Sequence, residues 1–97
     1  MIECNSIEEV RVNIDSIDEQ LVKLIALRGH FVNQAAKFKK NSDAVKAPKR
    51  VEEVISKVRS IAKINSANEE VVESVYTAMI DSFIKAEIKE FEKLNQL

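Results

Sequence analysis

The chain has little of what builds turns, disulfides or metal sites. Its 97 residues include one glycine, one proline, four phenylalanines, one tyrosine and no tryptophan, a composition that favours helices over a sheet. Cys4 is the single cysteine, so an internal disulfide is excluded. His30 is the single histidine, which argues against an ordinary zinc site and against a histidine-based catalytic triad. We therefore expect no metal site.

An excess of charge of either sign is also missing. The 15 lysines and arginines nearly balance the 16 aspartates and glutamates, and the formal net charge is −1. Such a chain lacks the basic surface that binds nucleic acid or an anionic membrane. No stretch approaches the ~20 apolar residues of a membrane span, and the acidic start MIECNSIEEV has no signal-peptide pattern. We expect a cytoplasmic protein with neither nucleic acid nor membrane as a partner.

What the chain does have is a helical hydrophobic pattern, which predicts an all-α fold of three helices. The first helix is expected to run from Asn5 or Ser6 to Lys39 or Lys40, with Ser6 and Glu9 forming a capping box. Its apolar seam recurs in steps of three and four residues: Ile7, Val10, Ile14, Ile17, Leu21, Leu24, Phe31, Ala35 and Phe38.

Two shorter helices follow, separated by polar interruptions. Pro48 suits the first turn of the second helix, and Asn68 is expected to cap the third. Their apolar positions run from Val51 to Ile61 and from Val72 to Leu94. The segment from Asn41 to Lys46 is expected to be a loop that breaks the first helix.

The helix lengths predict an intertwined homodimer built from single domains of residues 1–97. At 1.5 Å per residue the three helices measure roughly 50, 25 and 40 Å. Two shorter helices of the same chain cannot cover so long an apolar seam on a compact body. Gly29 is the only weak point inside the first helix, so a second copy covering the exposed half is simpler than a broken helix.

Arg28 falls where the seam of the first helix should carry an apolar residue. A buried unpaired cation costs several kcal/mol, a large share of the stability of a small domain. An anionic group should therefore meet Arg28. One interpretation is an internal salt bridge to Glu87, which lies on the apolar side of the third helix between Phe83 and Phe91.

The other interpretation is a pocket for a small polyanion. Arg11 and Lys39 flank the seam, and Arg50 lies in the first turn of the second helix, where a bound anion would relieve its conflict with the helix dipole. Arg11 and Arg28 are ~25 Å apart along one helix, too far for one metabolite to touch both. Arg28, Lys39, Arg50 and Glu87 of one chain could share a ligand, and Arg11 would come from the partner chain.

Five segments follow patterns known from a single protein family: V-R-x-x-I-D-x-I-D-E-Q-L at 10–21, L-I-A-L-R at 24–28, A-A-K-F-K at 35–39, A-P-K-R-V at 47–51 and I-x-A-E-I-K at 84–89. The chain thus resembles the all-helical chorismate mutase family, including its relatives the isochorismate-pyruvate lyases. The resemblance covers nearly the whole chain and implies three helices per chain, intertwined as a dimer with two sites.

The resemblance also implies roles for individual residues. Arg28 and the partner chain's Arg11 would hold the two substrate carboxylates, with Arg50 as a further site arginine. Lys39 would contact the ether oxygen of the breaking C–O bond and a carboxylate, and Glu87 would hydrogen-bond the same ether oxygen. The reaction, chorismate to prephenate, needs no nucleophile, general base or cofactor.

Two positions depart from the mutase pattern. Val51 stands where mutases often carry a glutamate for the ring hydroxyl, and Phe83 stands where they often carry a small hydroxylated residue. Both substitutions resemble the lyases, which release pyruvate from isochorismate to give salicylate, whereas Glu87 favours the mutase. A chorismate mutase is the preferred hypothesis, the lyase is the enzymatic alternative, and a non-catalytic ligand-binding or regulatory helical dimer is the third.

Overall fold

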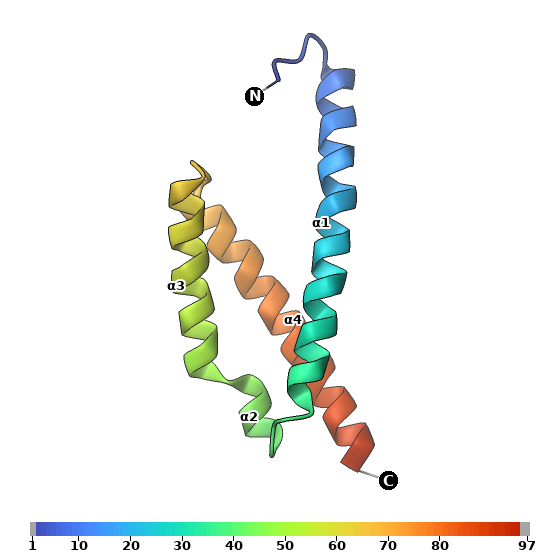
Figure 1. The fold of residues 1–97 in the computed structure, drawn as a ribbon, viewed down its shortest axis with the longest axis vertical. Coiled ribbons are helices and arrows are strands. Elements are labelled where there is room, and N and C mark those ends of the chain that lie inside the picture. The colour runs from blue at the N-terminus through green and yellow to red at the C-terminus, as the bar shows by residue number, and fades with distance from the viewer. Residues whose placement is uncertain (1, 96–97) are drawn as a thin grey trace. The chain divides into compact units, whose positions relative to one another are not determined.

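The computed structural model describes residues 2–95, including all their side chains except those of residues 42, 43 and 95. Four helices follow one another along the chain (Figure 1): α1 (Ile7–Ala36), α2 (Ser42–Lys46), α3 (Pro48–Ile64) and α4 (Glu69–Asn95). The prediction of an all-α fold with a long N-terminal helix is confirmed. α2 is an additional short helix in the segment that was expected to be a loop.

The chain divides into two compact units, Met1–Val32 and Asn33–Leu97. The first consists mainly of α1, and the second contains α2, α3 and α4. The single domain over residues 1–97 stays a prediction. In the part of the chain that the structure describes, no helix is both long enough and apolar enough to cross a bilayer.

The start of α1 is stabilised by the cap that the sequence predicted. The Glu9 amide donates to Ser6 Oγ at 3.1 Å, which satisfies one of the free N–H groups of the first turn. The Glu9 carboxylate accepts in return from the Asn5 amide at 2.9 Å, one residue before the position used in a standard capping box.

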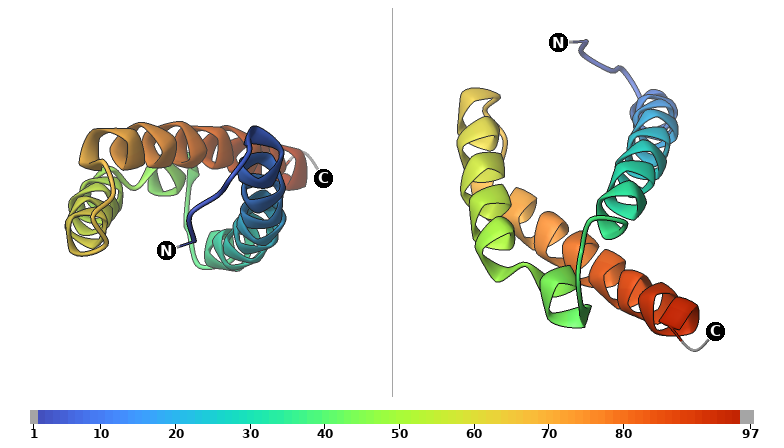
Figure 2. Two further views of the ribbon diagram at one scale, coloured as in Figure 1. Left: turned by 90° about the horizontal axis from the view of Figure 1, so that it is seen from above. Right: turned by 60° about the horizontal axis from the view of Figure 1, so that its bottom comes forward.

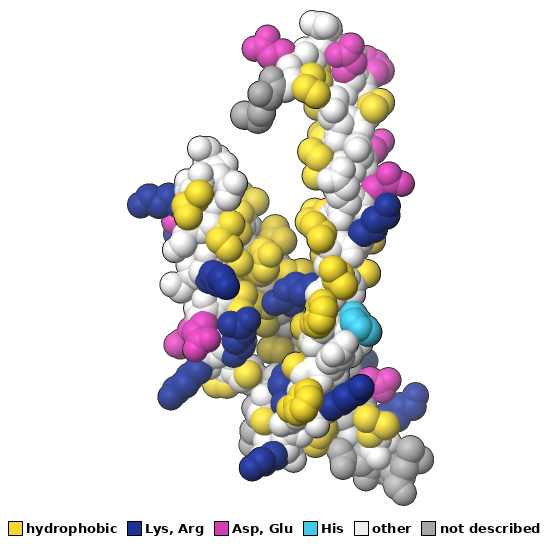
Figure 3. All heavy atoms as spheres, in the orientation of Figure 1, with side chains coloured by type: hydrophobic (Ala, Val, Ile, Leu, Met, Phe, Trp, Pro, Cys, Tyr) yellow, Lys and Arg dark blue, Asp and Glu magenta, His cyan; other side chains and the backbone are white. Residues whose placement is uncertain are grey.

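The apolar side of α1 is exposed along its whole length, and Figure 3 shows hydrophobic side chains at intervals along this helix. A single helix cannot bury its own apolar stripe. The exposed large apolar side chains of α1 are Ile7, Val10, Val12, Ile14, Ile17, Leu21, Val22, Leu24, Ile25, Leu27 and Phe31.

The end of α1 differs from the prediction, because the helix stops at Ala36 and not at Lys39 or Lys40. The amides of Lys37, Phe38 and Lys39 donate to carbonyls only three residues back, a tightened ending typical of a 3₁₀ turn. The pattern placed Phe38 in the apolar seam, but its side chain is 86% exposed. The length of a helix depends on packing as well as on periodicity. Because the Phe38 side chain is exposed, its packing does not stabilise a longer α1.

The core of the second unit lies between α3 and α4, which are joined by a short turn (Figures 1 and 2). Val54 and Val58 of α3 and Ile80 of α4 are buried against one another. The partly buried residues packed around them are Val51, Ile55, Val72, Tyr76 and Ile84. All of these lie at apolar positions that the sequence predicted, and burying each such side chain contributes roughly 1.5–3 kcal/mol.

The turn between α3 and α4 is closed by local hydrogen bonds. The Ala67 amide donates to the Ala62 carbonyl at 2.8 Å, while Ser66 adopts a left-handed conformation with φ 57°. Asn68 Oδ1 then accepts from the amides of Glu70 and Val71 at 3.0 and 3.1 Å. The predicted N-cap of this helix is confirmed.

α2 packs against α4, and both views in Figure 2 show the two helices side by side. Asn41 caps α2, since its Oδ1 accepts from the Ala44 amide at 2.8 Å. Ala47 links α2 to α3 with φ 37° and ψ 61°, a left-handed conformation that costs a non-glycine residue about 1–3 kcal/mol. Pro48 then starts α3 at a position where a missing amide proton costs nothing.

Candidate active site

The second unit brings together two of the predicted site residues, Lys39 and Glu87. The Lys39 ammonium lies 3.2 Å from Glu87 Oε1 and 3.5 Å from Oε2, so one lysine donates to both carboxylate oxygens. The residues are 48 positions apart in sequence. Lys39 follows the tight turn that ends α1, and Glu87 lies on α4.

Burial makes this pair more than a surface contact. The Glu87 side chain is 3% exposed and that of Lys39 is 22% exposed. Removing a carboxylate from water costs several kcal/mol unless a cation and hydrogen bonds compensate it. Among the described side chains, no buried nitrogen or oxygen lacks a hydrogen-bond partner. The Lys39 ammonium therefore compensates the charge of a carboxylate that α4 holds inside the protein.

The α4 face that carries Glu87 is otherwise apolar. Phe83 lies one turn before Glu87 on the same side of the helix and is half-buried, and Ile84 beside it packs against the α3–α4 core. A part-buried ammonium paired with a carboxylate on this apolar helix face suits the charged end of a ligand that also carries a hydrocarbon ring.

Arg50 and Val51 begin α3 and have different surroundings. The Arg50 guanidinium lies 3.6 Å from the Glu53 carboxylate, and both side chains are about two-thirds exposed, at 66% and 68%. Such an exposed pair contributes roughly 0–1 kcal/mol, so a ligand can displace Glu53 at little cost. Val51 packs partly into the α3–α4 core, where it offers no polar group.

The remaining predicted site residues lie in the first unit. Arg28 is half-buried on α1, while Arg11 is exposed near the start of the same helix. The structure thus joins Lys39 to Glu87 and pairs Arg50 with Glu53. The cation that contacts Glu87 within the second unit is Lys39, and the Arg28–Glu87 salt bridge stays a prediction.

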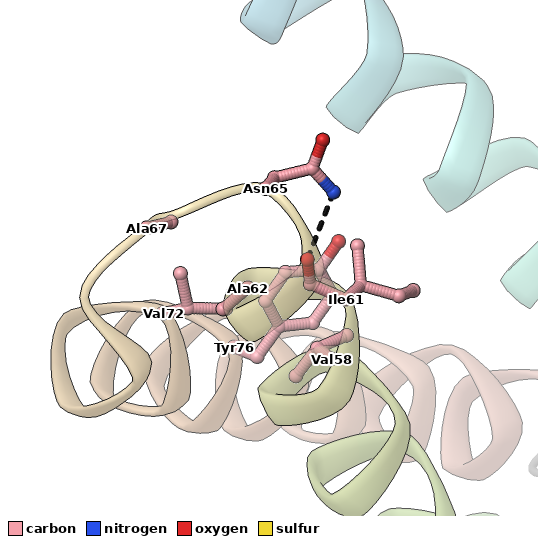
Figure 4. A pocket seen from close by; sticks show the side chains of 7 residues that line it. All are labelled: Val58, Ile61, Ala62, Asn65, Ala67, Val72 and Tyr76. Carbon is pink, nitrogen blue, oxygen red and sulfur yellow. Dashed lines mark hydrogen bonds between the residues drawn. The ribbon is translucent and has the colours of Figure 1, made fainter.

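A separate apolar cavity of about 260 Å³ lies where α3 turns into α4, shown in Figure 4. Its amide group, from Asn65, donates to the Ile61 carbonyl at 2.8 Å. No charged residue and no predicted site residue is among those that line it: Val58, Ile61, Ala62, Asn65, Ala67, Val72 and Tyr76. This lining does not suit a dianion, and the cavity is not the candidate site.

Sequence reasoning missed the contribution of α2, which follows Lys39 along the chain. Its residue Val45 is 1% exposed, the lowest value among the core side chains. The available signal was Asn41, which was interpreted only as a helix breaker although asparagine is also a preferred N-cap. An apolar valine one turn beyond such a cap is typical of a short packed helix.

Comparison with known proteins supports the resemblance seen in the motifs. Residues 10–88 match the chorismate mutase type II family. A relative from Pseudomonas aeruginosa, named isochorismate pyruvate lyase, is 29% identical over 87 residues, which cover 90% of this chain and 86% of that protein. Because the family match spans most of the chain and includes the segments that carry Lys39 and Glu87, the protein belongs to the chorismate mutase type II family.

Proposed function

We propose that the protein is a chorismate mutase, which rearranges chorismate to prephenate. In this reaction the ether C–O bond breaks and a C–C bond forms within one molecule, so no other reactant and no cofactor takes part. The observation that supports the proposal most directly is the part-buried Lys39–Glu87 pair, 3.2 Å apart inside a family whose substrate is an anionic enolpyruvyl ether.

Lys39 would act on the charge that develops during the reaction. As the C–O bond lengthens, negative charge grows on the ether oxygen, and a preorganised ammonium at that oxygen lowers the barrier. The geometry suits this role, because Glu87 holds the Lys39 ammonium in position. Removing one such donor typically lowers kcat by about 10²–10³-fold.

Glu87 would donate a hydrogen bond to the same ether oxygen. An ionised carboxylate can only accept, so Glu87 has to carry a proton when it donates to the ether oxygen. In the structure the Lys39 ammonium donates to both carboxylate oxygens of Glu87.

The arginines would restrain the substrate in its compact conformation. Arg28 of one chain and Arg11 of a second chain would each bind one carboxylate, since a guanidinium fork matches a carboxylate bidentately. Arg50 would add a third contact at the start of α3. Holding the reacting carbon atoms close together can supply several kcal/mol of the barrier reduction.

This arrangement requires a homodimer, and the exposed apolar side of α1 supports one. Contiguous exposed apolar surface of this extent marks an interaction site in a folded protein. A second copy would supply a surface of matching chemistry. Its Arg11 would complete the site that contains the first chain's Arg28, because the two arginines of one helix are ~25 Å apart. Light scattering on the purified protein tests the dimer directly.

Isochorismate-pyruvate lyase activity is the second candidate. Two observations favour it: the name of the Pseudomonas aeruginosa relative, and Val51, which packs in the core and offers no carboxylate for the ring hydroxyl of chorismate. The lyase reaction breaks the same ether bond, and a ring hydrogen moves to the enolpyruvyl carbon as pyruvate leaves.

Incubation of the purified protein with each substrate separates the candidates. Prephenate formed from chorismate, faster than salicylate is formed from isochorismate, supports the mutase. The opposite ratio supports the lyase. Tight binding of either compound without turnover would contradict both and leave the non-catalytic binding dimer.

A further inference from the structure

Val45 is the most deeply buried side chain of the core, although it belongs to a helix of only five residues. An isolated helix of this length is not stable in water, because its one or two hydrogen bonds do not compensate the loss of chain entropy. α2 therefore depends on its packing against α4. Among the residues of α2 whose side chains are described, Val45 is the buried one, so it provides the apolar contact.

Each end of α2 has a defined local structure. At its start, Asn41 Oδ1 accepts from the Ala44 amide at 2.8 Å. At its end, Ala47 keeps an unfavourable left-handed conformation directly before Pro48, a position that already restricts its backbone. Such conformations persist only where the surroundings determine them, and Val45 lies between the two ends.

Lys39 lies two residues before Asn41, the N-cap of α2. Its ammonium contacts Glu87 on α4, the same helix against which α2 packs. The chain between the end of α1 and the start of α3 thus meets α4 at an ion pair and at an apolar contact. A lysine has a flexible four-carbon stem, so the position of its ammonium depends on how firmly its backbone is held.

We propose that Val45 is a positioning residue, which acts through the backbone of the segment around residues 39–47 to hold the Lys39 ammonium at Glu87. The consequence for turnover rests on the proposed function, in which Lys39 contacts the ether oxygen. The effect on the Lys39–Glu87 pair itself does not depend on any enzymatic activity.

The first test compares Val45→Ala with Val58→Ala. Both changes remove the same two methyl groups from buried valines, at 1% and 8% exposure, but Val58 belongs to the α3–α4 core cluster, which does not include Lys39. Val45→Ala is expected to lower kcat by about ten- to a hundredfold, because a misplacement of about 1 Å costs up to 10²-fold. KM should change by less than about threefold, since the arginines still bind the carboxylates. Val58→Ala should keep kcat within about threefold of the wild-type value.

The second test measures the pair without substrate. Urea unfolding of Lys39→Met, Glu87→Gln and the double variant gives the coupling between the two side chains as the departure from additivity. The coupling should be present in the wild-type and Val58→Ala backgrounds and lost in the Val45→Ala background. Equal coupling in all three backgrounds would overturn the proposal, whether or not the protein is an enzyme.

Asn41→Ala provides a variant that creates no core cavity. It removes the cap of α2 at an exposed position, so the fold should survive even where Val45→Ala does not fold. We expect a smaller loss of the Lys39–Glu87 coupling in the same direction. A wild-type protein with no turnover on either substrate would defeat the proposed function alone, and an unchanged coupling in Asn41→Ala and Val45→Ala would defeat the role of Val45 alone.

Discussion

Ile80 on α4 is 8% exposed, whereas Ile17 on α1 is 60% exposed. The two isoleucines occupy equivalent positions in their own patterns, each on the apolar side of a long helix. In the second unit, α3 and α4 cover one another, so the pattern is satisfied within that unit. In the first unit the same kind of pattern continues along α1 and its side chains remain exposed.

The two units also differ in which candidate active-site residues they carry. The second unit holds Lys39 and Glu87 in a part-buried pair, while the first unit carries Arg11 and Arg28 on α1. The residues that would act on the breaking bond therefore belong to the unit with its own core. The residues that would bind the substrate carboxylates belong to α1, whose apolar side chains are exposed.

The largest expected effect comes from the arginines of the first unit. Arg28→Ala and Arg11→Ala should each lower kcat/KM by about 10³-fold, because each leaves a substrate carboxylate unpaired. Mixing the two inactive variants and letting subunits exchange should restore about one quarter of the wild-type activity, since half the dimers then contain one intact site of two. No restoration on mixing would show that both arginines serve the same chain's site.

The next effect concerns the ammonium of the second unit. Lys39→Met should lower kcat by about 10²–10³-fold through loss of the donor to the ether oxygen. It should also lower the free energy of unfolding by about 3 kcal/mol, because the buried Glu87 carboxylate loses its cation. Lys40→Met, at the exposed neighbouring position, is the matched control and should leave both quantities nearly unchanged. Equal losses in the two variants would exclude a special role for Lys39.

A third effect concerns the carboxyl group of Glu87. Glu87→Ala removes the hydrogen-bonding group at the ether oxygen and should lower kcat by about 10²-fold. Glu87→Gln keeps a side-chain donor, so it should retain more activity than Glu87→Ala. Equal losses of kcat in the two variants would contradict the donor role of Glu87.

A fourth effect concerns the dimerisation of the chain through the apolar seam of α1. Ile17→Asp places a charge in the apolar seam of α1 and should weaken the dimer by at least about tenfold, as measured by light scattering over a dilution series. Val12→Asp makes a similar change to an exposed apolar residue outside the seam and serves as the control. A dimer equally weakened by both changes would mean that the seam does not define the interface.

The smallest effect concerns the backbone of the second unit. Ser66 has φ 57° in the turn between α3 and α4, where a non-glycine residue is strained. Ser66→Gly should raise the free energy of unfolding by about 0.5 kcal/mol, since the relief of strain slightly exceeds the entropy that glycine adds to the unfolded chain. The midpoint of urea unfolding measures this, and a decrease would show that the strain at Ser66 is small.

Local signals in the sequence were enough to predict the caps and the α3–α4 core. Ser6 and Asn68 act on amides two or three residues away, so their roles depend on no distant part of the chain. The buried positions of Val54, Val58 and Ile80 follow from helical periodicity, because a turn of a few residues brings two amphipathic helices together.

The sequence by itself determined that the chain is helical, where its caps lie and which charged residues occupy apolar faces, since all three depend on spacing along a helix. Only the tertiary structure decided that α1 ends at Ala36, that α2 forms, and that Lys39 is a cation held against Glu87. The last of these features is a contact between two side chains that are 48 positions apart in the sequence. Periodicity describes one helix at a time and carries no information about which side chains meet after folding.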